Sequence, residues 1–129
     1  MHTGHCLCGA TRFTIALDTL RQPSACHCSQ CRRSSGHLWG GTTVMNDELT
    51  LDAGDNLKWF RSSEWAERGF CSACGSSLFY RPVNSDHLSV AIGCIDPPTD
   101  TRFKRHIFVA DKGDYYEIGE DGIPRFETY

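Results

Sequence analysis

The segment Cys26-His27-Cys28-Ser29-Gln30-Cys31 places three cysteines close together in the chain. Thiolates at this spacing can converge on one point, because a tight turn brings Cys28 toward Cys31 while Cys26 approaches from an extended residue. The segment is therefore typical of a metal-binding loop. Structural zinc takes four protein ligands, whereas a site with three leaves a position for water or substrate. The fourth ligand thus decides whether this loop is structural or takes part in a reaction.

Two further cysteine pairs lie before and after this loop. Each pair is followed by a glycine, in Cys6-Leu7-Cys8-Gly9 and in Cys71-Ser72-Ala73-Cys74-Gly75, and glycine lets the backbone turn close to a metal. Near-neighbour cysteines of this kind bind metal more readily than they form strain-free disulfides. A C-x-C turn facing a C-x-x-C turn completes a tetrahedral four-thiolate site. We therefore expect a structural zinc ion on Cys6, Cys8, Cys71 and Cys74.

The three-cysteine loop is then expected to hold a second, catalytic zinc ion on Cys26, Cys28 and Cys31. Three thiolates leave a divalent ion with a net negative charge, which suits capture of a thiol as thiolate better than activation of water. Arg32 and Arg33 follow directly. They are candidates to bind carboxylates of an anionic substrate, or they lie on a solvated helix face.

The remaining cysteine and the histidines leave alternatives open. Cys94 stands alone in an apolar run, where it is either a small buried hydrophobe or a fourth ligand that closes the second site. His27 lies between two expected ligands and is predicted to point away from their metal, and His5 has a similar position. His37 and His106 either lie near the pocket as proton carriers or have ordinary structural roles.

Size and composition indicate an ordinary globular protein. The 129 residues, of which 40% are hydrophobic and 22% charged, favour a single domain over residues 1–129. The formal net charge of −3 argues against nucleic acid as the main partner. Apolar runs such as residues 89–95 are far shorter than the roughly 20 residues of a membrane helix. No signal-peptide pattern begins the chain, so we expect a cytoplasmic protein without membrane contact.

The pattern of apolar residues predicts a mainly β fold. Thr11, Phe13, Ile15 and Leu17 alternate with other residues at the period of a strand. One short helix is expected to begin near Ser29 and to end at Gly36. The predicted strands cover residues 11–17, 38–45, 48–51, 56–62, 88–95, 102–110 and 115–118, with a hairpin around the cysteine turn over residues 68–80.

These motifs, taken in order, resemble the glutathione-dependent formaldehyde-activating enzyme family, which includes centromere-protein-V-like members. The resemblance is carried by residues 4–13, 26–32, 70–76 and 106–109. It implies an Mss4-like zinc-containing fold of several small antiparallel sheets, with the structural and catalytic zinc sites named above. It also implies a carbon–sulfur lyase-like reaction that joins formaldehyde and glutathione into S-hydroxymethylglutathione. Cys94, His5 and His37 depart from the residues expected at these positions.

Three classes of function fit the sequence. The first is an enzyme that binds a small-molecule thiol, glutathione or a similar one, at an open zinc ion and adds its sulfur to a small aldehyde, or reverses that step. The second is a zinc-stabilised module that binds protein or nucleic acid without catalysis, for which both metal sites would be closed. The third is a redox sensor that releases zinc from the second site on oxidation.

Overall fold

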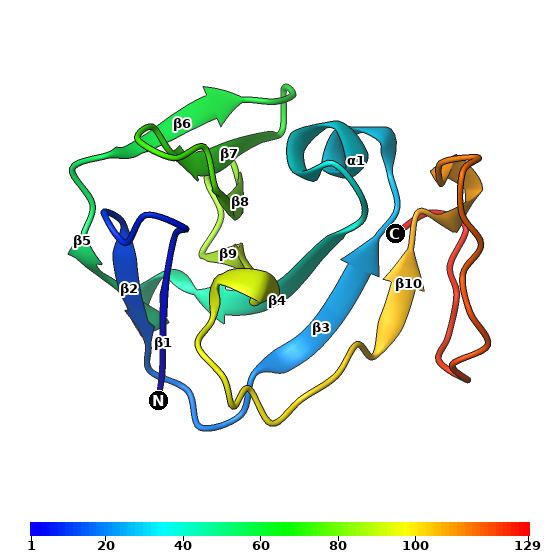
Figure 1. Ribbon diagram of the computed structural model, residues 1–129, viewed down its shortest axis with the longest axis horizontal. Helices are drawn as coiled ribbons and strands as arrows, with labels where there is room; N and C mark the ends of the chain where they lie inside the picture. Colours follow the sequence, from blue (N-terminus) through cyan, green and yellow to red (C-terminus); the bar gives the residue numbers. More distant parts are fainter.

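Two β-sheets form the framework of the computed structural model, which describes residues 1–129 (Figure 1). The only α-helix is α1 (Ser29–Ser35), and short 3-10 turns follow three of the strands. The strands are β1 (His2–His5), β2 (Arg12–Ile15), β3 (Arg21–Cys26), β4 (Trp39–Met45), β5 (Leu49–Ala53), β6 (Leu57–Arg61), β7 (Ala66–Cys71), β8 (Ser77–Pro82), β9 (His87–Ala91) and β10 (Arg105–Ile107). The 3-10 turns are η1 (Asn46–Glu48), η2 (Ile92–Cys94) and η3 (Val109–Asp111).

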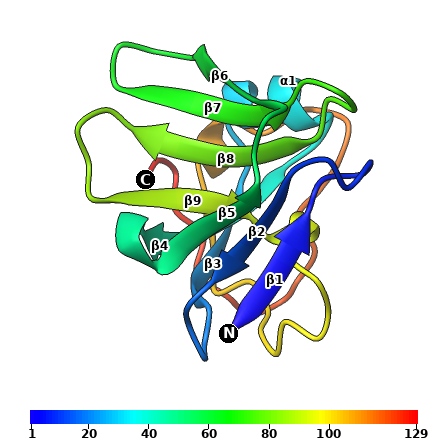
Figure 2. The ribbon, with the colours of Figure 1, turned by 90° about the vertical axis from the view of Figure 1, so that its left-hand side faces the viewer.

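The smaller sheet has the order β1-β2-β5 and is antiparallel throughout. The larger sheet has the order β10-β3-β4-β9-β8-β7-β6. Figure 2 shows its strands β6 to β9 stacked beside β4. All neighbours in the larger sheet are antiparallel except β10 and β3, which run in parallel at one edge.

The main core joins the two sheets. Phe13 and Ile15 are buried on the inner face of β2, because alternate side chains of a strand point to the same face. Phe13 meets Phe79 of β8 edge to face, with the ring centroids 5.5 Å apart. A second, smaller cluster lies away from this core and consists of Cys26, Cys31, Trp39, Ala91 and Ile107. The three-cysteine loop is therefore partly anchored in its own apolar cluster.

The glycine pair Gly40-Gly41 in β4 allows close packing on this second cluster. A Cβ atom on Gly40 would lie 2.8 Å from the ring of Phe103, and one on Gly41 would lie 2.5 Å from the ring of Trp39. Both distances are too short for real contacts, so the strand needs glycine at these positions to let the aromatic rings approach its backbone.

The prediction of a mainly β fold is confirmed, and so is the helix that begins at Ser29 and is stopped by Gly36, its C-cap residue, where φ is +90°. The predicted strands at 48–51 and 56–62 exist as β5 and β6 but lie in different sheets, because β5 pairs with β2 and β6 with β7. Strands β1 and β3 were not predicted.

Three predictions for the C-terminal third are wrong in extent or in kind. The strand expected at 88–95 ends at Ala91, where η2 begins. The strand expected at 102–110 covers only β10, because Phe108 has a left-handed φ of +56° that ends the extended backbone. No strand forms at 115–118, where Tyr115 and Tyr116 direct their hydroxyl groups to histidine rings.

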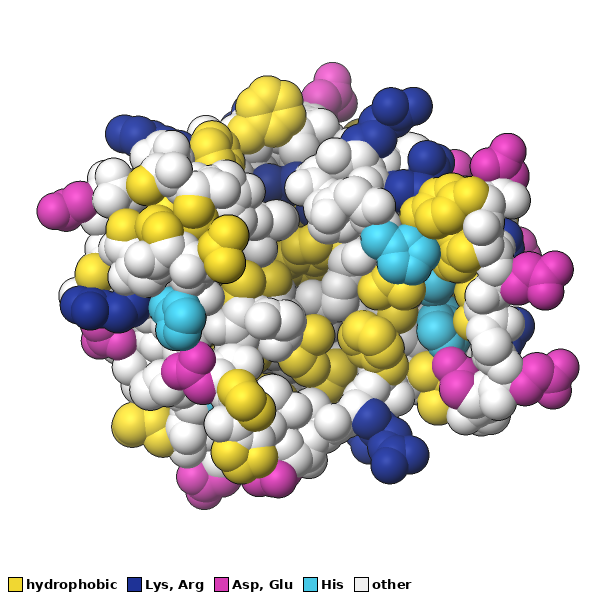
Figure 3. Space-filling view, viewed as in Figure 1, with side chains coloured by type: hydrophobic (Ala, Val, Ile, Leu, Met, Phe, Trp, Pro, Cys, Tyr) yellow, Lys and Arg dark blue, Asp and Glu magenta, His cyan; other side chains and the backbone are white.

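The C-terminal segment folds back along β10. His106 donates its backbone N–H to Pro124 and accepts one from Phe126, both at 2.9 Å. On the face seen in Figure 1, acidic side chains lie along the edge where this segment runs, and apolar side chains line a central hollow (Figure 3). No helix has the length and apolar character needed to cross a bilayer.

Candidate metal centres and substrate cavity

The N-terminal cysteine pair meets the C-x-x-C turn of the β7–β8 hairpin. The sulfur atoms of Cys6, Cys8, Cys71 and Cys74 all lie within 4.8 Å of one another. The Cys8 sulfur is 3.6 Å from that of Cys6 and 3.8 Å from that of Cys71. A tetrahedron with zinc–sulfur bonds of about 2.3 Å has sulfur–sulfur distances of roughly 3.8 Å. The four-cysteine group can therefore hold a metal ion.

Local backbone geometry positions these sulfur atoms. Gly9 and Gly75, which follow the two cysteine pairs, have φ angles of +79° and +81°, a conformation that glycine adopts without strain. Gly75 donates its N–H to the carbonyl of Cys71 at 2.7 Å and closes the turn. The Cys6 sulfur also accepts the N–H of Thr11 at 3.3 Å. Each cysteine pair is thus held in a turn whose inner side carries the sulfur atoms.

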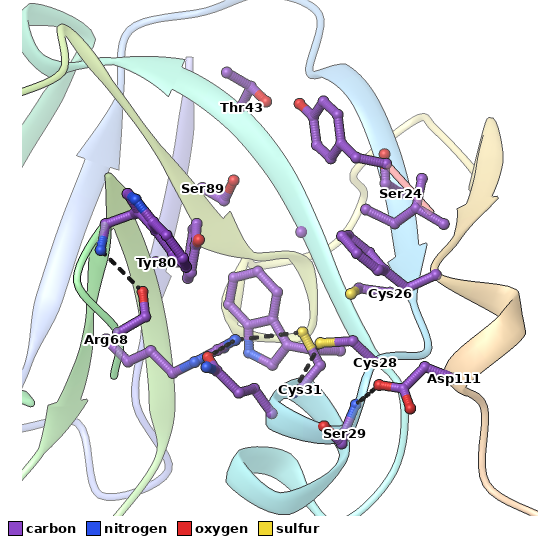
Figure 4. A pocket seen from close by; sticks show the side chains of 18 of the residues that line it. Ser24, Cys26, Cys28, Ser29, Cys31, Thr43, Arg68, Tyr80, Ser89 and Asp111 are labelled. Atoms are coloured by element: carbon purple, nitrogen blue, oxygen red, sulfur yellow. Dashed lines mark hydrogen bonds between the residues drawn. The ribbon is translucent and has the colours of Figure 1, made fainter. Parts of the chain in front are cut away.

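The second group is built where β3 passes into α1. Cys26 ends β3, Cys28 caps the helix, and Cys31 lies in its first turn. The Cys28 sulfur accepts the N–H of Cys31 at 3.3 Å, as an N-cap side chain does. The three sulfur atoms lie within 4.8 Å of one another and point toward a common centre (Figure 4). This three-cysteine group can also hold a metal ion.

The three thiols cannot all ionise easily without a cation. Hydrogen bonding to Cys26, which has the largest effect, and to Cys31 lowers the pKa of the Cys28 thiol to about 2. Contact with Cys28 raises the pKa of Cys26 instead. A negative charge on one sulfur thus opposes ionisation of its neighbour, and a divalent cation would relieve this repulsion. The chemistry of these donors therefore fits a metal that prefers thiolates.

Cys94 lies outside the three-cysteine group. Its thiol donates to the backbone carbonyl of Ser77 at 3.7 Å, and burial raises its pKa. A buried thiol with a carbonyl partner behaves as a small hydrophobe. The alternative in which Cys94 closes the second site is therefore not supported by its position.

A cavity of about 520 Å³ opens beside the three-cysteine group, and all three of its cysteines line the wall. The opposite wall carries small hydroxyl residues, including Ser24, Thr43 and Ser89 (Figure 4). The four-cysteine group contributes no residue to this cavity. The two cysteine groups therefore differ both in the number of sulfur atoms and in access to a ligand-sized space.

Comparison with known proteins places the whole arrangement in a family. The family model described as "Glutathione-dependent formaldehyde-activating enzyme" matches residues 1–111, which include all eight cysteines. This chain belongs to that family. The resemblance seen in the cysteine motifs is thereby confirmed, and the fold with its two cysteine groups is compatible with the expected Mss4-like fold.

Proteins from distant organisms are similar to this chain over most of its length. An uncharacterized lyase of Schizosaccharomyces pombe is 26% identical over 122 residues, which cover 91% of this chain and 85% of that protein. A Halomonas elongata protein named after the same family is 28% identical and covers 89% of this chain and 79% of its own length. The crystal structure of a Rhodobacter sphaeroides protein has the same fold, with a TM-score of 0.64 at 22% identity over 95% of this chain and 98% of that one.

The arginines that line the cavity of this family member are not those singled out in the sequence. Arg32 is half-buried and Arg33 exposed on α1, and neither lines the cavity. Arg68 of β7 and Arg105 of β10 do. The sequence does contain a signal for Arg68. It lies two residues after Ala66, and alternate residues of a strand face the same side; in β7 both are buried. Arg105 has a similar signal, because in the strand predicted at 102–110 it faces the same side as Ile107, which also lines the cavity.

Tyr80 of β8 also lines the cavity and was not singled out in the sequence. It packs against the small cluster that contains Cys26 and Cys31. Burial raises the pKa of its hydroxyl, so Tyr80 keeps its proton at neutral pH. It can therefore donate a hydrogen bond to an oxygen atom of a ligand in the cavity.

The histidines form a layer behind the three-cysteine loop. His27 points away from the sulfurs, as expected, and its ring nitrogens contact the Tyr116 hydroxyl at 2.5 Å and the His106 ring at 2.9 Å. His106 in turn contacts Asp121 at 2.6 Å. Burial lowers the pKa of His27 to about 4. These residues link the loop to the C-terminal segment, and neither histidine lines the cavity.

The other two histidines singled out in the sequence also lie outside the cavity. His37 is exposed, and its ring contacts the Tyr115 hydroxyl at 2.6 Å. His5 is exposed beside Asp96, with 3.4 Å between the nearest nitrogen and oxygen atoms. Both therefore have contacts of the kind that surface histidines commonly make.

Proposed function

We propose that this protein is a zinc-dependent, carbon–sulfur lyase-like enzyme that acts on the adduct of a small-molecule thiol and a small aldehyde. Glutathione and formaldehyde, which form S-hydroxymethylglutathione, are the pair indicated by the family description. The observation that carries this proposal is the contrast between the two cysteine groups. One has four sulfur atoms and no part in the cavity, and the other has three and lines it.

We assign zinc to both groups, because sets of thiolate ligands in tetrahedral arrangement favour it. Cys6, Cys8, Cys71 and Cys74 would hold the structural ion, and Cys26, Cys28 and Cys31 the catalytic one. When bound at the three-cysteine group, zinc supplies a position at which a substrate thiol is held as thiolate. A chain with this many free thiols is best suited to the reducing cytoplasm, where thiols persist. We also propose that residues 1–129 form one domain.

The residues of the cavity would then orient the carbonyl compound. A new bond forms between the thiolate sulfur and the carbonyl carbon, while the π electrons of the carbonyl move to its oxygen. That oxygen takes up a proton, which balances the proton that the thiol lost. The Tyr80 hydroxyl can donate a hydrogen bond to this oxygen as its negative charge develops. The reverse sequence cleaves the carbon–sulfur bond and returns thiol and aldehyde.

Arg105 is the cavity residue best placed to bind a carboxylate of an acidic thiol such as glutathione. Its Nε donates to Ser24 at 2.9 Å, and its guanidinium faces the ring of Tyr129 at 5.2 Å. It forms no ion pair with a carboxylate of the chain. Guanidinium matches carboxylate geometry with two parallel hydrogen bonds. The predicted role of Arg32 and Arg33 in substrate binding stays a prediction. Because neither residue lines the cavity, they could contact only a part of the ligand that extends outside it.

We expect Arg105→Gln to raise the KM for glutathione about 10-fold with little change in kcat, because the lost contact is made equally in the ground and transition states. Steady-state kinetics with formaldehyde at saturation measure both constants. The matched control is a neutral thiol, 2-mercaptoethanol, for which the variant and the unaltered protein should have the same KM. An equal increase for both thiols would show that Arg105 does not bind a carboxylate.

The proposal itself is tested by metal analysis combined with a glutathione titration. We expect two zinc ions per chain, saturable binding of glutathione, and glutathione-dependent loss of formaldehyde measured by NMR. The alternative, a zinc-stabilised binding module, predicts two ions without thiol affinity or turnover. The absence of thiol binding by the fully zinc-loaded protein would overturn the enzymatic assignment.

A further inference from the structure

Arg68 is a buried cation directed at the three-cysteine group. It lies in the middle of β7, opposite Phe60 on one side and Tyr80 on the other, and is only 8% exposed. Its side chain crosses the base of the cavity toward the sulfurs (Figure 4). The Nη2 atom is 3.5 Å from the Cys31 sulfur and 3.4 Å from the Gln30 side-chain oxygen.

The remaining polar atoms of Arg68 have no partner. Nε and Nη1 are buried without a hydrogen bond, and no carboxylate of the chain forms an ion pair with the guanidinium. The Tyr80 ring lies 5.0 Å away and offers a cation–π contact. A buried charge is stable only beside an opposite charge. The groups beside Arg68 that can carry a negative charge are the thiols of the three-cysteine group.

The net charge of the three-cysteine centre with its metal ion depends on Arg68. Three thiolates and a divalent ion have a net charge of minus one, which the guanidinium of Arg68 neutralises. A thiolate as fourth ligand brings the total to minus one with Arg68, and to minus two without it. A neutral fourth ligand such as imidazole adds no charge. The presence of Arg68 therefore strengthens binding of an anionic fourth ligand much more than binding of a neutral one.

We propose that Arg68 is a specificity-determining residue that selects an anionic sulfur ligand at the open position of the three-cysteine centre. The inference rests on the proposed function, because it requires a metal ion with a free position. Arg68 acts here through its charge and its contact with the Cys31 sulfur, and is a positioning residue. A purely structural role, in which Arg68 only braces α1 through Gln30, predicts no difference between ligand classes.

The test compares two ligands on cobalt(II)-substituted protein, whose visible spectrum reports a change of ligand at tetrahedral sulfur sites. The unaltered protein and Arg68→Gln are titrated with 2-mercaptoethanol and with imidazole. We expect Arg68→Gln to weaken thiol binding about 10-fold or more, while the imidazole affinity stays within about 2-fold. Arg68→Lys, which keeps the charge, should retain most of the thiol affinity.

Arg12→Gln is the matched control, because Arg12 is exposed on β2 in the other sheet and the substitution removes the same charge. It should leave both affinities unchanged. Arg68→Met, which keeps the packing on Tyr80, replaces Arg68→Gln if that variant does not fold. Unfolding of both neutral variants would overturn the inference, because Arg68 would then act on the fold.

The same titration separates failure of the inference from failure of the proposed function. If the spectrum of the unaltered protein responds to neither ligand, the centre has no open position and the proposed function fails. If the unaltered protein binds both ligands and Arg68→Gln weakens both equally or neither, the proposed function stands. Selection by Arg68 is then refuted.

Discussion

Replacing Cys28 by serine is expected to remove one of two bound metal ions and to lower thiol-dependent turnover at least about 100-fold. Serine keeps its proton at neutral pH and is a poor zinc ligand. The helix should survive, because a serine hydroxyl can cap α1 as the Cys28 sulfur does through its contact with the N–H of Cys31. Metal analysis, NMR of the thiol adduct and circular dichroism measure the three outcomes.

Cys94→Ser is the matched control, since it makes the same chemical change outside both cysteine groups. It should retain two metal ions and full turnover. Loss of the second ion in this control would show that Cys94 is a ligand after all, and the centre would then be closed. Turnover that persists in Cys28→Ser would instead contradict a catalytic role for the three-cysteine group.

Both cysteine groups could be predicted from the sequence because cysteine spacing is a local signal. A C-x-C or C-x-x-C turn brings its sulfurs together whatever the rest of the chain does, and the glycines at 9 and 75 have the left-handed backbone that such turns need. The end of α1 at Gly36 follows from the same property. These features depend on a few neighbouring residues.

The residues that shape the cavity could not be predicted in this way. Arg68 and Tyr80 come from neighbouring strands, β7 and β8, and approach the three-cysteine group only through the pairing of distant segments. Arg32 and Arg33 are close to those cysteines in sequence but lie outside the cavity, because a helix turns successive residues to different sides. Closeness along the chain therefore did not indicate which arginines line the cavity.

Strand pairing was hardest to predict where the apolar pattern is short. Residues 48–51 and 56–62 were expected as strands joined by a turn, yet the chain passes from one sheet to the other between them. Hydrophobic alternation identifies a strand but not its partner. The contact between the two sheets matters for stability. The four-cysteine group spans them, because Cys6 follows β1 of the smaller sheet and Cys71 ends β7 of the larger one.

Replacing Cys71 by serine is expected to unfold most of the chain. The four-cysteine group links the turn after β1 to the β7–β8 hairpin, and Cys6 and Cys71 are buried at 1% and 0% exposure. A structural zinc site contributes on the order of 10 kcal/mol, while a whole domain is stable by about 5–15 kcal/mol. Losing the site should therefore remove most of the stability. Near-ultraviolet circular dichroism and thermal unfolding measure the loss.

Ser72→Ala is the control, because Ser72 is exposed in the same turn and its side chain makes no hydrogen bond. Its unfolding temperature should stay within a few degrees of the unaltered protein. Removal of the zinc ion by a strong chelator should have the same effect as Cys71→Ser, and added zinc should reverse it. If Cys71→Ser unfolds cooperatively near the original temperature, the apolar contacts of the main core, such as that between Phe13 and Phe79, are enough to join the sheets, and the four-cysteine group does not stabilise the fold.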